Sequence, residues 1–146
     1  MNDSATDAYS ACPECGARLT DGLACWEQLG YLIAWEATDP ALRAEHFLLV
    51  ASYNLQHPAQ FTDDALSNLR AGFVDRLDSG VAVSELRRRA SRQFEGKTRV
   101  LRPASERMPV RRAWALTIDS VYLPDQPEGA ADRVRSWAEA IRRELP

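Results

Sequence analysis

The stretch LACWEQLGYLIAWEATDPALRAEHFLLVASYNLQH, residues 23–57, contains two runs of apolar residues at helical spacing, separated by Asp39-Pro40. This spacing predicts one helix over 21–38, capped by its first residue, an aspartate, and a second helix over 40–57. Proline fits the first position of a helix and aspartate is a good N-cap, so a new helix starts at the dipeptide. Because the connection is that short, we expect the two helices to form an antiparallel hairpin.

The rest of the chain is also predominantly helical. In order, the sequence predicts a helix over 62–79, a helix over 84–95, an extended or loop segment over 97–112, a strand over 114–122 and a helix over 129–145. The strand is predicted because apolar residues alternate along WALTIDSVY. The predicted fold class is therefore mainly α, a helical bundle with a small β-hairpin near residues 98–122.

The composition is that of an ordinary globular protein. The chain has 146 residues, 45% of them apolar, and a formal net charge of -3, which suits one domain with its own core. The opening residues are polar and acidic, so we expect a disordered tail over 1–11, no signal peptide, and a single domain over 12–146. No segment approaches the roughly 20 apolar residues that a membrane span needs, and we expect a cytoplasmic protein.

Positive charge is concentrated in one segment. The net charge is -9 over residues 1–85, +8 over residues 86–112 and -2 over residues 113–146. Such a basic segment is typical of nucleic-acid-binding proteins, so a nucleic-acid-binding module that uses the arginines of residues 87–112 is one alternative. Aromatic residues are sparse there and the acidic remainder offers internal partners. We therefore expect the arginines to be neutralised within the protein and nucleic acid not to bind.

Three cysteines lie within fourteen positions near the N-terminus, Cys12 and Cys15 in CPECG and Cys25 in DGLAC. An odd, clustered set fits a metal in a reducing compartment better than a disulfide framework. A C-x2-C followed by glycine turns two thiolates toward one ion, and a closed zinc site needs four ligands. The sequence therefore predicts an N-terminal zinc knuckle that is completed by one histidine.

The chain has two histidines, and helix geometry distinguishes between them. Measured from the turn at about 1.5 Å per residue, Cys25 lies about 21 Å along the first helix, His57 about 27 Å along the second and His46 only about 10 Å. Since zinc demands a nitrogen within about 2.1 Å, we expect His57 to be the fourth ligand.

A second polar pair is predicted away from this site. Helical spacing puts Glu36 and His46 on matching stripes of the two helices, close to the turn that joins them. We expect the two side chains to satisfy each other at the edge of the core, and a second functional spot is the alternative.

Four motifs, CPECG, DGLAC, HFLLVASYNLQHP and RVRSWAEAI, together resemble a functionally uncharacterised family of small bacterial proteins marked by an N-terminal CPxCG and an internal YxLQHP. The resemblance extends from Cys12 to about Ile141. It implies that the three cysteines and both histidines are candidate metal-site positions, and it implies no activity.

These observations favour a small cytoplasmic zinc-binding protein that is not an enzyme, binds a protein partner and has a structural site of three cysteines and one histidine. A metalloenzyme with an open three-cysteine zinc site, in which water takes the fourth position, is the alternative from a different class. Thiol-disulfide exchange is disfavoured because no strand precedes the CPxC motif, and cysteines buried without a metal are the remaining interpretation. The sequence leaves open whether a reaction is catalysed, which partner binds and which oligomeric state forms.

Overall fold

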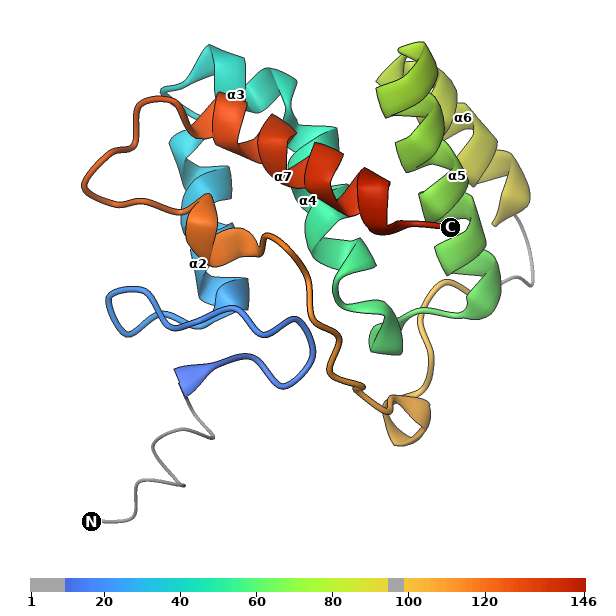
Figure 1. Ribbon diagram of the computed structural model, residues 1–146. Helices are drawn as coiled ribbons and strands as arrows, with labels where there is room; N and C mark the ends of the chain where they lie inside the picture. Colours follow the sequence, from blue (N-terminus) through green and yellow to red (C-terminus); the bar gives the residue numbers. More distant parts are fainter. Residues whose placement is uncertain (1–9, 95–98) are drawn as a thin grey trace.

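Six α-helices dominate the computed structural model, which describes residues 10–94 and 99–146 (Figure 1). The helices are α2 (Cys25–Trp35), α3 (Pro40–Ala44), α4 (His46–Leu55), α5 (Asp63–Ser79), α6 (Val83–Gln93) and α7 (Ala130–Glu144). The 3-10 helices are η1 (Pro58–Gln60), η2 (Ala104–Glu106) and η3 (Ile118–Ser120). The described part of the chain contains isolated β-bridges and no strand, which confirms the mainly α class.

Three of the predicted segments lie partly outside these ranges, among them the start of the predicted loop over 97–112. Residues 1–9, which form most of the predicted disordered tail over 1–11, are outside the described residues, and so is the end of the predicted helix over 84–95. Ala11 pairs with Arg18 in an isolated antiparallel bridge.

Helix α7 lies at the centre of the core. Its residues Val134, Trp137, Ala138 and Ile141 recur at helical spacing, and all four are fully buried. The helix packs against α3, α4 and α5, and Figure 1 shows it lying across α4. Burial of each large apolar side chain stabilises the fold by about 1.5–3 kcal/mol, so this face holds the C-terminal helix on the bundle.

The N-terminal helical hairpin differs from its prediction in its bounds, since the first helix ends at Trp35 and the second at Leu55. The first helix begins at Cys25 and not at Asp21, because Asp21 and Gly22 have φ values of 51° and 76° and form a tight turn. The second predicted helix is divided at Glu45 into α3 and α4. The N–H of Glu45 donates to the carbonyl of Leu42 at 2.9 Å, and this i to i-3 bond of the 3-10 type ends α3. The side chain of Leu42 is fully buried.

The predicted β-hairpin near residues 98–122 is wrong. No strand occurs between residues 99 and 122, and η3 occupies part of the predicted strand. Ile118, Val121 and Tyr122 are all buried. A helical turn places residues at i, i+3 and i+4 on one side, whereas a strand would direct the last two to opposite faces. Burial against the core therefore selects the helical turn.

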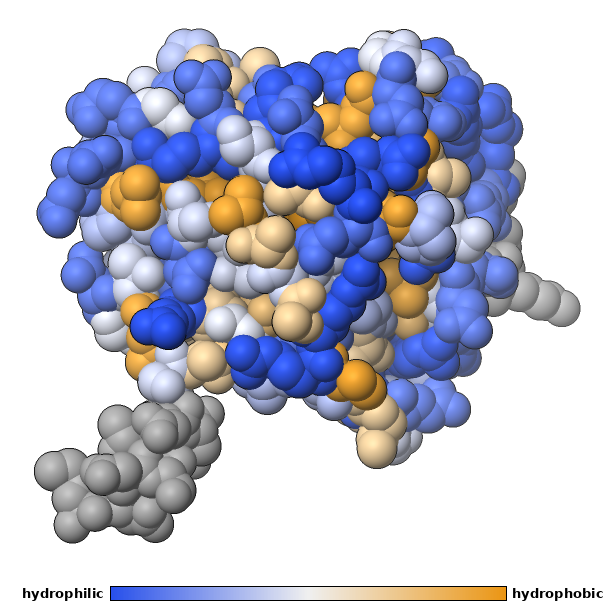
Figure 2. Space-filling view, in the orientation of Figure 1, coloured by the Kyte–Doolittle hydropathy of each residue, from blue (hydrophilic) through white to orange (hydrophobic). Residues whose placement is uncertain are grey.

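The face drawn in Figure 2 is mainly hydrophilic, and its hydrophilic residues surround smaller hydrophobic areas. Within the described residues, no helix is both long and apolar enough to cross a membrane.

Candidate metal centre

Four side chains from three segments of the chain converge on one point. The Sγ atoms of Cys12, Cys15 and Cys25 and one ring nitrogen of His57 all lie within 4.8 Å of one another. Nε2 of His57 is 3.4 Å from Sγ of Cys25 and 3.6 Å from Sγ of Cys12. The three cysteines are free, and all four residues except the half-buried Cys12 are buried. The four residues that the sequence predicted thus form a buried group of three cysteines and one histidine, the CCCH group, which is suitable for a metal ion.

A tight turn presents the first two cysteines. The N–H of Gly16 donates to the carbonyl of Cys12 at 3.0 Å, and the N–H groups of Glu14 and Cys15 both point at Sγ of Cys12, at 3.4 Å. Hydrogen bonds of this kind favour the thiolate, the form that binds metals. Gly16 has a φ of +83°, and a Cβ there would come within 2.6 Å of Nη2 of Arg111. The left-handed conformation is what favours glycine here, because the exposed guanidinium of Arg111 could move away from a Cβ.

The third cysteine is placed by the start of α2. Cys25 is the first residue of this helix, and the side chain of Glu27 accepts a hydrogen bond from the N–H of Ala24 at 3.0 Å. The fully buried Gln28 donates from Nε2 to the carbonyls of Arg18 and Leu23, at 2.9 and 3.0 Å. Gln28 therefore holds the loop between the knuckle and Cys25 against α2.

The end of α4 places the histidine. Gln56 is the C-cap of α4 and is buried. Its Nε2 donates to the carbonyl of Leu116 at 2.8 Å, and its Oε1 accepts from Nε1 of Trp137 at 3.3 Å. These contacts link the residue before His57 both to α7 and to the segment before η3. Gln56 was not predicted as a site residue, although it lies inside the LQHP motif.

Tyr53 orients the imidazole ring. Nδ1 of His57 lies 2.6 Å from the carbonyl oxygen of Tyr53, and a carbonyl only accepts, so Nδ1 carries the proton and Nε2 faces the sulfurs. The two rings are stacked, with centroids 4.0 Å apart and an interplanar angle of 23°. The hydroxyl of Tyr53 also lies 3.8 Å from Sγ of Cys25. The i, i+4 spacing of Tyr53 and His57 is the signal in the sequence for this contact.

The side chains of the CCCH group are hydrogen-bonded to one another, so that the pKa of each depends on its neighbours. Burial lowers the pKa of His57, but hydrogen bonds with Cys12, Cys25 and the carbonyl of Tyr53 outweigh it and raise the pKa to about 10. Hydrogen bonds from the Cys15 and Cys25 side chains lower the pKa of Cys12. The pKa of Cys15 is raised, chiefly because its thiol donates to Cys12. A bound cation replaces the shared protons and favours three thiolates with a neutral imidazole.

The second polar pair is present at the other end of α2. Nδ1 of His46 lies 2.7 Å from Oε2 of Glu36, and Nε of Arg43 donates to the backbone carbonyl of Glu36 at 3.2 Å. The carboxylate side chain is 11% exposed and the imidazole 42% exposed. His46 thus contacts Glu36 and has no place in the CCCH group.

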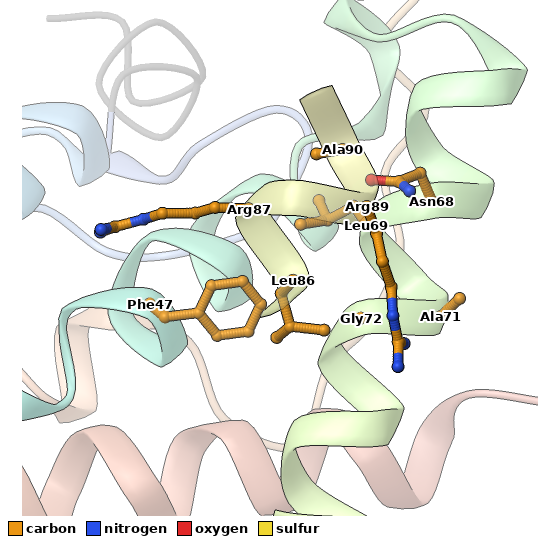
Figure 3. Close-up of a pocket in the computed structure, with 9 residues that line it drawn as sticks. All are labelled: Phe47, Asn68, Leu69, Ala71, Gly72, Leu86, Arg87, Arg89 and Ala90. Carbon is orange, nitrogen blue, oxygen red and sulfur yellow. The ribbon is translucent and has the colours of Figure 1, made fainter. Parts of the chain in front are cut away.

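An apolar cavity lies elsewhere, between α5, α6 and the start of α4 (Figure 3). Its volume is about 190 Å³, and Phe47, Leu69 and Leu86 provide its apolar wall. Arg89 at its edge is paired with Asp75 at 2.7 Å. None of the lining residues is a cysteine, histidine or carboxylate, so the cavity offers no nucleophile and no general base.

Acidic partners occupy several arginines of the basic segment. The ion pairs are Arg88 with Glu85 at 2.7 Å, Arg89 with Asp75 at 2.7 Å, Arg92 with Glu85 at 3.5 Å and Arg102 with Asp63 at 2.7 Å. These four ion pairs lie within α5, α6 and the segment that follows α6. The expectation that nucleic acid does not bind stays a prediction.

The fold and the site together define a small, mainly helical protein built beside a buried CCCH group. A family model, DUF5946, described as a family of unknown function, matches residues 10–146. The chain therefore belongs to this family, in agreement with the CPxCG and YxLQHP motifs. Comparison with curated proteins and with solved structures found no match.

Proposed function

We propose that the CCCH group binds one zinc ion as a closed structural site, and that the protein is a non-enzymatic, partner-binding protein of the cytoplasm. The observation that carries this proposal is the convergence of Cys12, Cys15, Cys25 and His57 within 4.8 Å. Three thiolates and an imidazole are a donor set that structural zinc sites use.

The distances support zinc. Bonds of about 2.3 Å to sulfur and about 2.0–2.1 Å to nitrogen, at tetrahedral angles, separate the two donor atoms by about 3.5 Å. The observed separations from Nε2 of His57 are 3.4 Å to Sγ of Cys25 and 3.6 Å to Sγ of Cys12. Nε2 of His57 therefore lies at the separation of a tetrahedral zinc site from two of the three sulfurs.

The number and origin of the ligands support a structural role. Four protein ligands fill a tetrahedral site and leave no position for substrate, unlike the open sites of zinc enzymes. No carboxylate of the described residues belongs to the group. The ion would join the knuckle to the ends of α2 and α4, so its binding free energy becomes folding free energy.

The surroundings support the remaining parts of the proposal. Free cysteines persist in a reducing compartment such as the cytoplasm. The ion pairs of Arg88, Arg89 and Arg102 support the view that the basic segment is neutralised internally and binds no nucleic acid. The partner that we propose is therefore a protein.

Metal analysis and a pair of matched variants test the proposal. Purified protein should contain about one zinc per chain, and cobalt-loaded protein should show the visible spectrum of tetrahedral thiolate coordination. His57→Ala should lose that spectrum, and His46→Ala, the same change eleven positions earlier, should keep it. Absence of zinc and of a cobalt spectrum in the wild-type protein would refute the proposal. A spectrum lost in His46→Ala but retained in His57→Ala would refute the ligand assignment.

A further inference from the structure

The three cysteines of the CCCH group differ in their exposure to solvent. Cys15 is 2% exposed and Cys25 is 5% exposed, whereas Cys12 is half-buried. The guanidinium of the exposed Arg111 donates to the carbonyl of Cys12 at 3.4 Å. The N–H groups of Glu14 and Cys15 point at the sulfur of Cys12. Cysteines that react with oxidants are partly exposed thiolates in electropositive surroundings, and buried structural cysteines are inert. Of the three, Cys12 fits the reactive type.

A cavity lies beside two of these cysteines. Its volume is about 210 Å³, and its lining includes Cys12 and Cys25 but not Cys15. Leu19, which is 43% exposed, and Trp26, which is 65% exposed, also line it, so the cavity opens at the surface. A molecule of liquid water occupies about 30 Å³, and hydrogen peroxide has only one oxygen atom more. A peroxide molecule therefore has room to reach Cys12 and Cys25.

The sulfurs of Cys12 and Cys25 are close enough to be joined. The ligand atoms of the CCCH group lie within 4.8 Å of one another, and the three cysteines are free. A disulfide bond is about 2.05 Å long, so the two sulfurs need to approach by less than about 3 Å. Residues 13–24 between them contain turns and isolated bridges and no helix. The knuckle can therefore shift toward Cys25 without displacing a helix.

We propose that Cys12 and Cys25 are a site of reversible oxidation by hydrogen peroxide, which joins them in a disulfide and opens the zinc site. The inference rests on the proposed function, since it names the regulation of the same site. Sγ of Cys12, as the thiolate, attacks one oxygen of the peroxide, the O–O bond breaks, and hydroxide leaves a sulfenic acid on Cys12. Sγ of Cys25 then attacks the sulfur of Cys12, the S–O bond breaks, and a second hydroxide leaves. Two thiolates thus lose two electrons, which reduce the peroxide to two hydroxide ions.

This disulfide divides the CCCH group. Cys15 and His57 would remain as ligands, and two ligands do not fill a tetrahedral site, so we expect the ion to leave. The disulfide still joins the knuckle to α2, whereas His57, which follows α4, loses its link to both. Disulfides in the cytoplasm are usually transient and redox-sensing, and a dithiol returns this one to two thiols. Oxidation would therefore detach the knuckle and α2 from the end of α4 until the protein is reduced.

Treatment of zinc-loaded protein with excess peroxide tests the inference. The number of free thiols per chain should fall from three to one, with release of the zinc to a coloured chelator, and a dithiol with added zinc should reverse both changes. Trypsin cleaves after Arg18 and separates Cys25 from the other two cysteines. A glutamate-specific protease cleaves after Glu14 and separates Cys12 from Cys15. Mass spectrometry of the double digest should find the peptides of Cys12 and Cys25 linked.

Two variants that each lose one candidate ligand are matched controls. Cys15→Ser keeps both reacting sulfurs and should form the disulfide, whereas in Cys25→Ser the sulfenic acid on Cys12 should persist and be trapped by dimedone. A disulfide between Cys12 and Cys15 in the wild-type protein, or a sulfenic acid trapped first on Cys15, overturns the inference.

Zinc content measured before oxidation separates the two proposals. Zinc-loaded protein that keeps its three thiols under excess peroxide refutes only the oxidation site. Zinc-free protein that forms the disulfide between Cys12 and Cys25 refutes only the proposed zinc site.

Discussion

Gln56 should be among the most sensitive positions outside the four candidate ligands. It is buried at the end of α4 and bridges the carbonyl of Leu116 and the indole N–H of Trp137. Gln56→Leu keeps a side chain of similar size and removes both hydrogen bonds. The carbonyl of Leu116 and the fully buried indole N–H of Trp137 then lose the hydrogen bonds that they make with Gln56.

The magnitude follows from these two groups. A buried polar group left without its partner costs about 1–3 kcal/mol. The bond to Trp137 is long at 3.3 Å and Leu116 is only half-buried, so we take the lower part of that range for each. The expected loss is about 2–4 kcal/mol in the free energy of unfolding. In a chain of this length, a loss of about 3 kcal/mol lowers Tm by roughly 6–12 °C.

Urea unfolding of zinc-loaded protein, followed by circular dichroism, measures this loss. Gln126→Leu is the matched control, because the same change at an exposed position should alter stability by no more than about 0.5 kcal/mol. Since His57 follows Gln56 directly, the variant should also bind zinc more weakly, which a chelator competition detects. A loss below about 1 kcal/mol would show that the two hydrogen bonds do not hold α4 in place.

Three further predictions concern the metal and the basic segment. Removal of zinc should lower Tm by at least about 5 °C, because zinc at 100 times its Kd contributes about 2.7 kcal/mol to the free energy of unfolding. Cys12→Ser should lower Tm by a similar amount in calorimetry. An unchanged Tm after verified zinc loss would contradict a structural role. Zinc affinity should fall on acidification, because His57 with a pKa of about 10 and Cys15 with a raised pKa both carry protons that zinc must displace. Two protons give a change of about 100-fold per pH unit between pH 6 and 8, measured by chelator competition, and a slope below one proton would contradict the proposed ligands. DNA and RNA should not bind with micromolar affinity at physiological salt; fluorescence anisotropy that shows salt-sensitive binding, lost in Arg88→Ala or Arg111→Ala, would reverse this expectation.

The sequence by itself determined the four residues of the CCCH group and the helical class. Both depend on local patterns: the CPECG turn requires only its own glycine and backbone, and apolar spacing along Val134 to Ile141 identifies the buried side of α7. The choice of His57 over His46 also followed from the sequence, because helix rise and a short connection fix approximate distances along a hairpin. That choice survives the division of the second helix, since α4 still ends beside the knuckle.

Only the tertiary structure decided the features that depend on distant partners. Trp114, Leu116 and Ile118 alternate as in a strand, yet Ile118, Val121 and Tyr122 are buried at the spacing of a helical turn. The division of the second helix at Glu45, where a 3-10 bond ends α3, is likewise invisible in a continuous helical pattern. Gln56 holds the end of α4 through residues 60 and 81 positions away. Contacts between such distant segments leave no periodic signal in the sequence. Periodicity reports only which residues of one helix or strand share a face, and not which distant residue each of them contacts.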